Sequence, residues 1–159
     1  MTDQTPAPNS PSIKKKILSW LPYIALPLMV YFGNVEIQSY LGNKALEEVA
    51  LPKLNLEEAM AQAKHEDKLV LADMSAIWCP SCRKLDKEVL AKQTVQEAIN
   101  KRYVFSRIEY ESDEGAAFMQ KYDVSGFPTL LVLDADGNPL KKLPLTFSPE
   151  TFIGYLQHF

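Results

Sequence analysis

The feature that most constrains the fold of this chain is a pair of cysteines, Cys79 and Cys82, with two residues between them. They are the only two cysteines among the 159 residues. Thiols at this spacing can close a small disulfide ring and reopen it without disturbing much else. A short apolar run (69–72) precedes the pair and predicts a buried strand, and the residues that follow it (83–90) have helical composition. The pair is therefore predicted to lie at a strand-to-helix turn.

This turn places Cys79 at the N-terminus of the predicted helix. Pro80 fits the first helical turn, where its missing N–H is no loss. Unpaired backbone N–H groups and the positive end of the helix dipole lower the pKa of a thiol at this position and favour the thiolate. We therefore predict that Cys79 is the attacking thiolate and that Cys82, one turn further in and more covered, is the resolving thiol. Exchange would run through a mixed disulfide between Cys79 and a partner, which Cys82 then breaks.

Other roles for the pair remain open. A structural disulfide closing so short a loop would add little stability. A zinc site needs two further ligands, and the only histidines, His65 and His158, stand singly. A two-coordinate Cu(I) site needs only the two thiolates, so a copper chaperone is an alternative of a different class. A membrane-tethered scaffolding domain is a third class, and its function would survive replacement of Cys79.

The first 35 residues divide into two segments of different composition. Residues 1–16 are rich in Pro, Ser and Thr and end in a basic flank (14–16), which predicts a disordered tail on the cytoplasmic side. The run 17–35 contains no charged residue, and as a helix it would span roughly 28 Å, enough for the hydrocarbon core of a bilayer. Pro22 and Pro27 are tolerated in membrane helices. We therefore predict an uncleaved transmembrane anchor at 17–35.

The charges around this run predict its orientation. Three lysines precede it and Glu36 follows it, which places the N-terminus in the cytoplasm. The chain is then a single-pass protein of the inner membrane with its remaining residues in the periplasm, an oxidising compartment where cysteines cycle through disulfides. A cleaved signal peptide is the main alternative, but the end of the run (30–34) offers no cleavage site of small residues. A buried helix of a soluble protein is disfavoured because the run has no polar face.

The rest of the chain is predicted to be a juxtamembrane linker (36–53) followed by a single folded domain (54–159). Residues 36–159 carry 14 basic and 19 acidic side chains, a net charge of about −5, which argues against binding to nucleic acid. Apolar runs predict strands at residues 69–74, 103–110, 130–133 and 140–143. Helical patterns bracket these strands, so we predict an α/β sandwich with a mixed sheet.

Two motifs resemble a known family. Trp-Cys-x-x-Cys at residues 78–82 resembles the active-site motif of the thioredoxin superfamily, and Gly-Phe-Pro-Thr at residues 126–129 resembles its cis-proline loop. The resemblance covers about residues 54 to 159. It implies a thioredoxin-like three-layer sandwich with a central mixed β-sheet, here preceded by one N-terminal transmembrane helix. The segment 73–90 resembles the periplasmic thioredoxin-like domains of bacterial transmembrane disulfide reductases more than it resembles ordinary thioredoxin.

The resemblance also implies roles for residues beyond the cysteines. Asp73 matches the buried acid of thioredoxin, where burial would raise the carboxyl pKa toward neutrality and suit it to take the proton of Cys82. Pro128 would lie opposite the disulfide, and a cis bond before it would leave the backbone of Phe127 free to pair with an extended partner segment. Trp78 would be a lid beside the active site.

Other positions depart from the thioredoxin pattern. Arg107 aligns with a lysine near the buried acid, although an arginine on a strand is more often a solvated surface charge. The dipeptide between the cysteines is Pro-Ser where thioredoxin has Gly-Pro, so the thioredoxin reduction potential does not transfer. Ser75 replaces an aromatic residue, which changes the packing expected around Asp73.

Together these patterns predict a membrane-anchored thiol–disulfide oxidoreductase that acts on periplasmic proteins, as a reductase supplied by an upstream electron-carrying protein. A thiol oxidase or isomerase is the alternative within the same class. The predicted substrate-binding residues are Trp78, Pro80, Phe127 and Pro128. No cofactor is expected beyond the redox-active disulfide Cys79–Cys82, and no metal.

Overall fold

The computed structural model describes residues 13–158, and it describes side chains from Trp20 onward. The chain divides into two units, Met1–Val35 and Glu36–Phe159. Most of the tail predicted at residues 1–16 lies outside the described residues. The second unit contains the sheet and both cysteines, and it is the part of the chain on which the functional argument rests.

Helix α1 (Ile13–Glu47) runs through the segment predicted to span a membrane. Within the part of the chain that the structure describes, no helix is long and apolar enough to cross a membrane. From Trp20 onward, prolines, tyrosines and Asn34 interrupt the aliphatic side chains of this helix. The helix is present where the sequence predicts one, but the membrane span predicted at 17–35 is not confirmed.

The segment predicted as a linker at 36–53 contributes to the second unit. It is helical up to Glu47. Ala45, Val49 and Leu51 are each at most 3% exposed. Val49 and Leu51 belong to the core cluster that also contains Leu71 of the central strand. The segment therefore packs with the folded domain.

Four strands form one mixed sheet in the order β2-β1-β3-β4. The central strand β1 (Leu69–Ser75) is parallel to β2 (Tyr103–Glu109) and antiparallel to β3 (Thr129–Leu133). Strand β4 (Pro139–Lys142) forms a hairpin with β3 and is the exposed edge. The predicted α/β class and the mixed sheet are confirmed.

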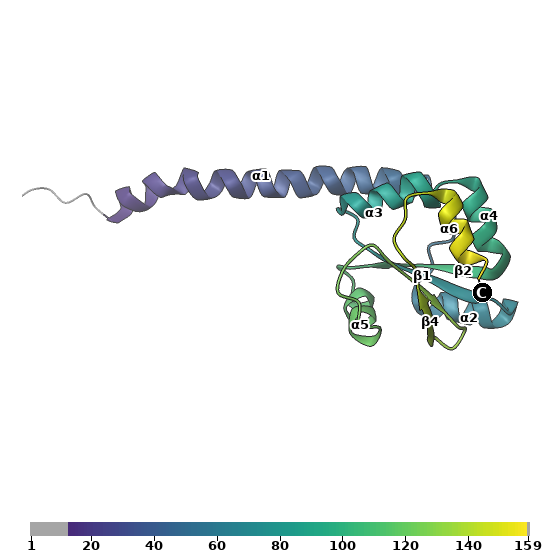
Figure 1. The fold of residues 1–159 in the computed structure, drawn as a ribbon. Helices are drawn as coiled ribbons and strands as arrows, with labels where there is room; N and C mark the ends of the chain where they lie inside the picture. The colour runs from purple at the N-terminus through teal and green to yellow at the C-terminus, as the bar shows by residue number, and fades with distance from the viewer. Residues whose placement is uncertain (1–12, 159) are drawn as a thin grey trace, which may run out of the picture. The chain divides into compact units, whose positions relative to one another are not determined.

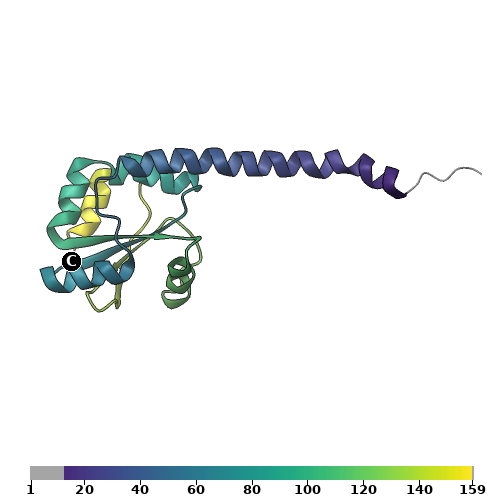
Figure 2. The ribbon, with the colours of Figure 1, turned by 180° about the vertical axis from the view of Figure 1, so that it is seen from behind.

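Helices cover both faces of this sheet (Figures 1 and 2). Helices α2 (Leu56–Glu66) and α5 (Asp113–Lys121) pack on one face. On the other lie α3 (Pro80–Leu85), the π-helix η1 (Asp86–Leu90), α4 (Gln93–Arg102) and α6 (Pro149–Leu156). Each face has its own apolar core, so the domain has the three layers that the sequence predicts.

The alternation of side chains along β1 determines which of them face the helix that carries the cysteines. Successive side chains of a strand point to opposite faces. Val70, Ala72 and Met74 pack in the core beneath α2 and α5, whereas Leu71 packs in the core beneath η1 and α4. Asp73 is two residues after Leu71, so its carboxylate is directed to the face that carries the cysteine helix.

Candidate active site

The two cysteines lie at the turn from β1 into α3, as predicted. Cys79 is the N-cap of α3 with an extended backbone, and Pro80 occupies the first helical turn. The Cys82 N–H donates to Cys79 Sγ at 3.2 Å, and the Cys79 N–H donates to the Ala76 carbonyl at 2.9 Å. The turn therefore directs a backbone N–H at the sulfur that we predict to attack.

Both cysteines are free thiols in this structure, and both are buried. Cys79 is 4% exposed and Cys82 is 1% exposed, so the predicted resolving cysteine is the more covered. Burial is the main reason that the pKa of Cys82 rises to about 12, and Cys79 raises it further, whereas the Ser75 side chain and the Ala76 backbone oppose the shift. Cys82 therefore keeps its proton at neutral pH and needs a base to remove it.

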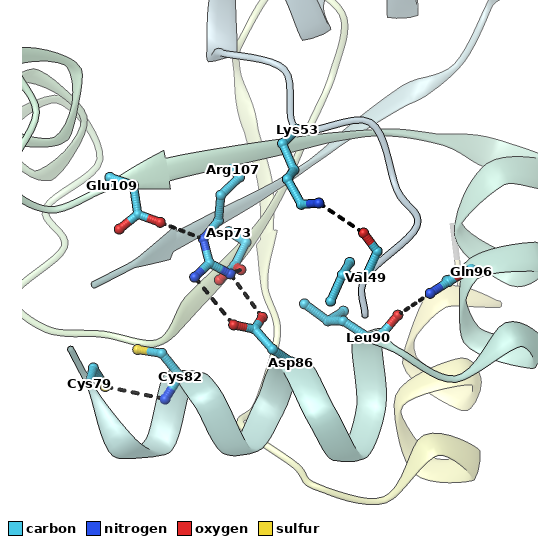
Figure 3. Close-up of polar contacts among 10 residues, drawn as sticks. All are labelled: Val49, Lys53, Asp73, Cys79, Cys82, Asp86, Leu90, Gln96, Arg107 and Glu109. Atoms are coloured by element: carbon cyan, nitrogen blue, oxygen red, sulfur yellow. Dashed lines mark hydrogen bonds and ion pairs between the residues drawn. The ribbon is translucent and has the colours of Figure 1, made fainter. Parts of the chain in front are cut away.

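A buried ion cluster lies beside the cysteine helix (Figure 3). Arg107 Nη1 donates to Asp73 Oδ2 at 2.8 Å and to Asp86 Oδ1 at 2.9 Å. Arg107 Nε donates to Glu109 Oε1 at 3.0 Å. Asp73 is fully buried and the Arg107 side chain is only 4% exposed. Three carboxylates therefore share one guanidinium next to the redox pair.

Arg107 lies beside the buried acid Asp73, as its alignment with the thioredoxin lysine implies, and is not a solvated surface charge. Strands β1 and β2 pair so that Arg107 lies opposite Asp73. On that face of the sheet, the helical layer that contains Asp86 covers the Arg107 side chain. Its guanidinium therefore contacts carboxylate oxygens in place of water. Removing one partner from a buried ion pair is costly, so Asp73, Asp86 and Arg107 fix one another in place.

Asp86 is a site residue that the sequence analysis did not identify. It begins η1, is 1% exposed and lies four residues after Cys82. Residues at this spacing share one side of a helix, and Figure 3 shows the Cys82 and Asp86 side chains on the same side. Burial raises the pKa of Asp86 and Arg107 opposes the rise. Its position four residues after Cys82 was the sequence signal that could have identified Asp86 as a site residue.

The environment of Asp73 suits it to carry a proton at neutral pH. Burial raises the pKa of Asp73 to about 7, against the positive charge of Arg107 and with help from the negative charges of Asp86 and Glu109. Its Oδ2 accepts from Arg107, and its Oδ1 has no hydrogen-bond partner among residues 13–158. Oδ1 is therefore the oxygen available to take a proton.

This pKa predicts how an Asp73→Asn variant changes stability with pH. The folded chain binds more protons at this site than the unfolded chain between about pH 4 and pH 7, so the wild-type free energy of unfolding falls as pH rises through that interval. Asp73→Asn should therefore gain up to about 4 kcal/mol relative to the wild type between pH 4 and pH 8. Urea unfolding across this range measures the difference. The exposed Asp136→Asn is the matched control, and equal pH dependence in both variants would contradict the shift.

The cis-proline predicted from the sequence is present. The Phe127–Pro128 peptide bond is cis. It directly precedes β3, whose Thr129 pairs with Met74 of β1, so the loop lies at the end of the sheet from which the cysteine turn departs. Phe127 packs against the small cluster that contains both cysteines.

Aromatic side chains surround this loop. The rings of Trp78 and Phe127 meet edge to face with centroids 5.5 Å apart, and Tyr110 lies 5.0 Å from Phe127. Trp78 Nε1 donates to Glu111 Oε1 at 3.2 Å. Pro80, which directly follows Cys79, is exposed. Tyr110 was not identified from the sequence, because it joins the group only through the loop that follows β2.

A thioredoxin-type sheet, a CxxC turn at a helix N-terminus and an adjacent cis-proline define a thiol–disulfide oxidoreductase. Residues 56–159 match the family described as a thioredoxin-like domain. The chain belongs to that family.

Curated relatives place the chain more closely. A thiol:disulfide interchange protein DsbD of Yersinia enterocolitica is 33% identical over 145 residues, which cover 89% of this chain and 24% of that protein. A DsbD of Colwellia psychrerythraea is 32% identical over 90 residues, covering 55% of this chain and 15% of that protein. The chain thus spans at most about a quarter of the length of these two relatives.

Solved structures agree with this placement. The DsbD C-terminal domain of Neisseria meningitidis in its oxidised form superposes with a TM-score of 0.54 at 27% identity, covering 65% of this chain and 91% of that domain. A thioredoxin from Thermus thermophilus superposes with a TM-score of 0.62 at 22% identity, covering 69% and 86%, which supports the fold. The chain therefore resembles the C-terminal domain of DsbD.

Proposed function

We propose that this chain is a disulfide reductase that passes two electrons from an upstream donor protein to disulfide-bonded substrate proteins. The observation that carries the proposal is the placement of a carboxyl group with a pKa of about 7 in the buried cluster beside the high-pKa thiol of Cys82. The direction of transfer rests on the resemblance of segment 73–90 to disulfide reductases and on the similarity to DsbD.

The proposed reaction has two displacement steps. The Cys79 thiolate attacks one sulfur of the substrate disulfide, which forms a Cys79–substrate bond and releases the other substrate sulfur as a thiolate that takes a proton. Cys82 then gives its proton to Asp73 and attacks Cys79 Sγ. This step breaks the mixed disulfide and leaves a Cys79–Cys82 disulfide, and the second substrate sulfur leaves as a thiolate that takes the proton from Asp73. The upstream donor returns two electrons and two protons to the pair.

The substrate would approach over the aromatic residues beside the cysteines. Trp78 and Phe127 offer an apolar surface next to Cys79, and Pro128 borders it. An extended segment of the partner could lie along this loop in the manner of an added strand, with its disulfide over Cys79. Pro80 is exposed in the first turn of α3, directly after Cys79. Tyr110 would extend the apolar contact toward β2.

Transfer between proteins tests the direction. The reduced full chain is mixed with an excess of a disulfide-bonded protein such as insulin, and thiols are alkylated and counted by mass spectrometry. We expect the substrate to gain two thiols for each chain that loses two. Faster oxidation of a reduced protein by the disulfide form of the chain would support the thiol oxidase alternative instead.

We further propose that the domain works in the periplasm, held at the inner membrane by residues 17–35. The uncharged run and the lysines before it support this proposal, as does the similarity to DsbD. In cells, the full chain should stay with the membrane pellet after an alkaline carbonate wash, and a variant lacking residues 1–35 should be released. Release of both by the wash would rule out the anchor.

A further inference from the structure

Helix α1 makes an unusually close approach to the loop that leads to Cys79. Gly42 of this helix is buried against the backbone of Ile77, two residues before Cys79. A Cβ atom at position 42 would lie 1.8 Å from the Ile77 carbonyl oxygen and 2.9 Å from its carbonyl carbon. The obstacle is backbone, which a side-chain rotation cannot move aside. Only glycine fits this crossing without a shift of the loop.

A second contact ties the same face of α1 to the helix that follows Cys79. Arg83 Nη1 donates to Gln38 Oε1 at 2.5 Å. Gln38 and Gly42 are four residues apart, so they share one side of α1. Arg83 directly follows Cys82. One helix face therefore contacts the chain on both sides of the CxxC motif, before Cys79 and after Cys82.

This face lies outside the part of the chain that matches the thioredoxin-like family, which begins at residue 56. It belongs nevertheless to the compact unit Glu36–Phe159. Ala45, just beyond Gly42 on α1, is 1% exposed, so the end of the helix is packed into the domain. The contact therefore lies outside the segment that the family model matches.

We propose that the Gln38–Gly42 face of α1 is a positioning element for the redox centre, which sets the rate of thiol exchange and the reduction potential of the cysteine pair. The proposal rests on the exchange chemistry proposed above. The Ile77 backbone fixes where the turn to Cys79 begins, and Arg83 fixes the first turn of α3. These two positions determine how the Cys82 N–H meets Cys79 Sγ, a contact of 3.2 Å.

Gly42→Ala and Gly33→Ala form a matched pair that tests the proposal in the full chain. Both add one methyl group to α1 with the same gain in helix propensity, but a Cβ at Gly33 meets nothing within 4 Å. We measure the rate of Cys79 alkylation against pH and the dithiol–disulfide equilibrium in glutathione buffers. Disturbing the turn weakens the hydrogen bond from the Cys82 N–H to the attacking Cys79 sulfur, so Gly42→Ala should slow alkylation by about tenfold and shift the equilibrium. Gly33→Ala should match the wild type.

Folding is checked by circular dichroism and thermal unfolding. A folded Gly42→Ala variant with the wild-type alkylation profile and equilibrium would overturn the proposal. If that variant fails to fold, Gln38→Leu tests the proposal in its place, because it removes only the hydrogen bond to Arg83. We expect Gln38→Leu to change the rate of Cys79 alkylation and the dithiol–disulfide equilibrium by about threefold each. Wild-type values of both would overturn the proposal. A wild-type chain that exchanges no thiols would overturn the proposed function and the positioning role together.

Discussion

Replacing Cys79 by serine is expected to abolish thiol–disulfide exchange, whereas Cys82→Ser should preserve the first attack and accumulate a mixed disulfide with the partner. Cys79 is the less buried thiol, and it receives the Cys82 N–H at the helix N-cap. Without Cys82 nothing in the pair can break the bond between Cys79 and the substrate. Non-reducing electrophoresis with a disulfide-bonded protein detects the trapped species.

Ser81→Ala is the matched control for these two variants. Ser81 Oγ lies 3.1 Å from Cys79 Sγ and is the polar side chain between the cysteines. Its loss removes one contact to the sulfur but leaves both thiols, so turnover should continue without a trapped complex. Accumulation of a mixed disulfide in Cys79→Ser, with none in Cys82→Ser, would show that the roles of the two cysteines are reversed.

Asp73→Asn is expected to slow the second displacement by about two orders of magnitude near neutral pH, the usual contribution of a positioned base. Burial raises the pKa of Cys82 to about 12, so this thiol seldom ionises without help. The rate of the wild-type step should rise with an apparent pKa of about 7, the value for Asp73. The variant should lack that inflection and recover toward higher pH. Rapid mixing with a preformed mixed disulfide follows the step directly.

Two variants accompany this measurement. Asp86→Asn changes the neighbouring carboxylate that shares Arg107, and it should shift the inflection without removing it, because Asp73 keeps its own contact with Arg107. Asp136→Asn alters an exposed carboxylate on the hairpin and should leave the rate unchanged. A wild-type rate and pH profile in Asp73→Asn would exclude Asp73 as the base.

The parts of the site that depend on local sequence could be predicted. A strand, a proline after the first cysteine and helix-forming residues suffice to place Cys79 at a helix N-cap. The cis-proline loop was predicted from four consecutive residues, and the bond is cis. The buried position of Asp73 followed from the motif and is confirmed. Each of these features is encoded within a few residues.

The parts that depend on pairing between distant segments could not be predicted. Arg107 is buried because the register of β1 and β2 places it opposite Asp73, and the sequence does not state that register. The spacing of Asp86 from Cys82 was a signal for its side of the helix, but its contact with Arg107 joins a helix to a strand that comes later in the chain, which the spacing does not reveal. The packing of Gly42 against Ile77 likewise joins segments with no shared pattern.

The reduction potential of the full chain tests the central claim most directly. The protein is equilibrated in defined thiol–disulfide buffers, and alkylation followed by mass spectrometry gives the fraction with both Cys79 and Cys82 reduced. We expect one reversible two-electron transition near about −270 mV, as for a reductant. A transition near about −120 mV would contradict the reductase direction. No reversible transition at all would contradict the redox function itself, and Cu(I) binding by the two thiols would then be the role to test.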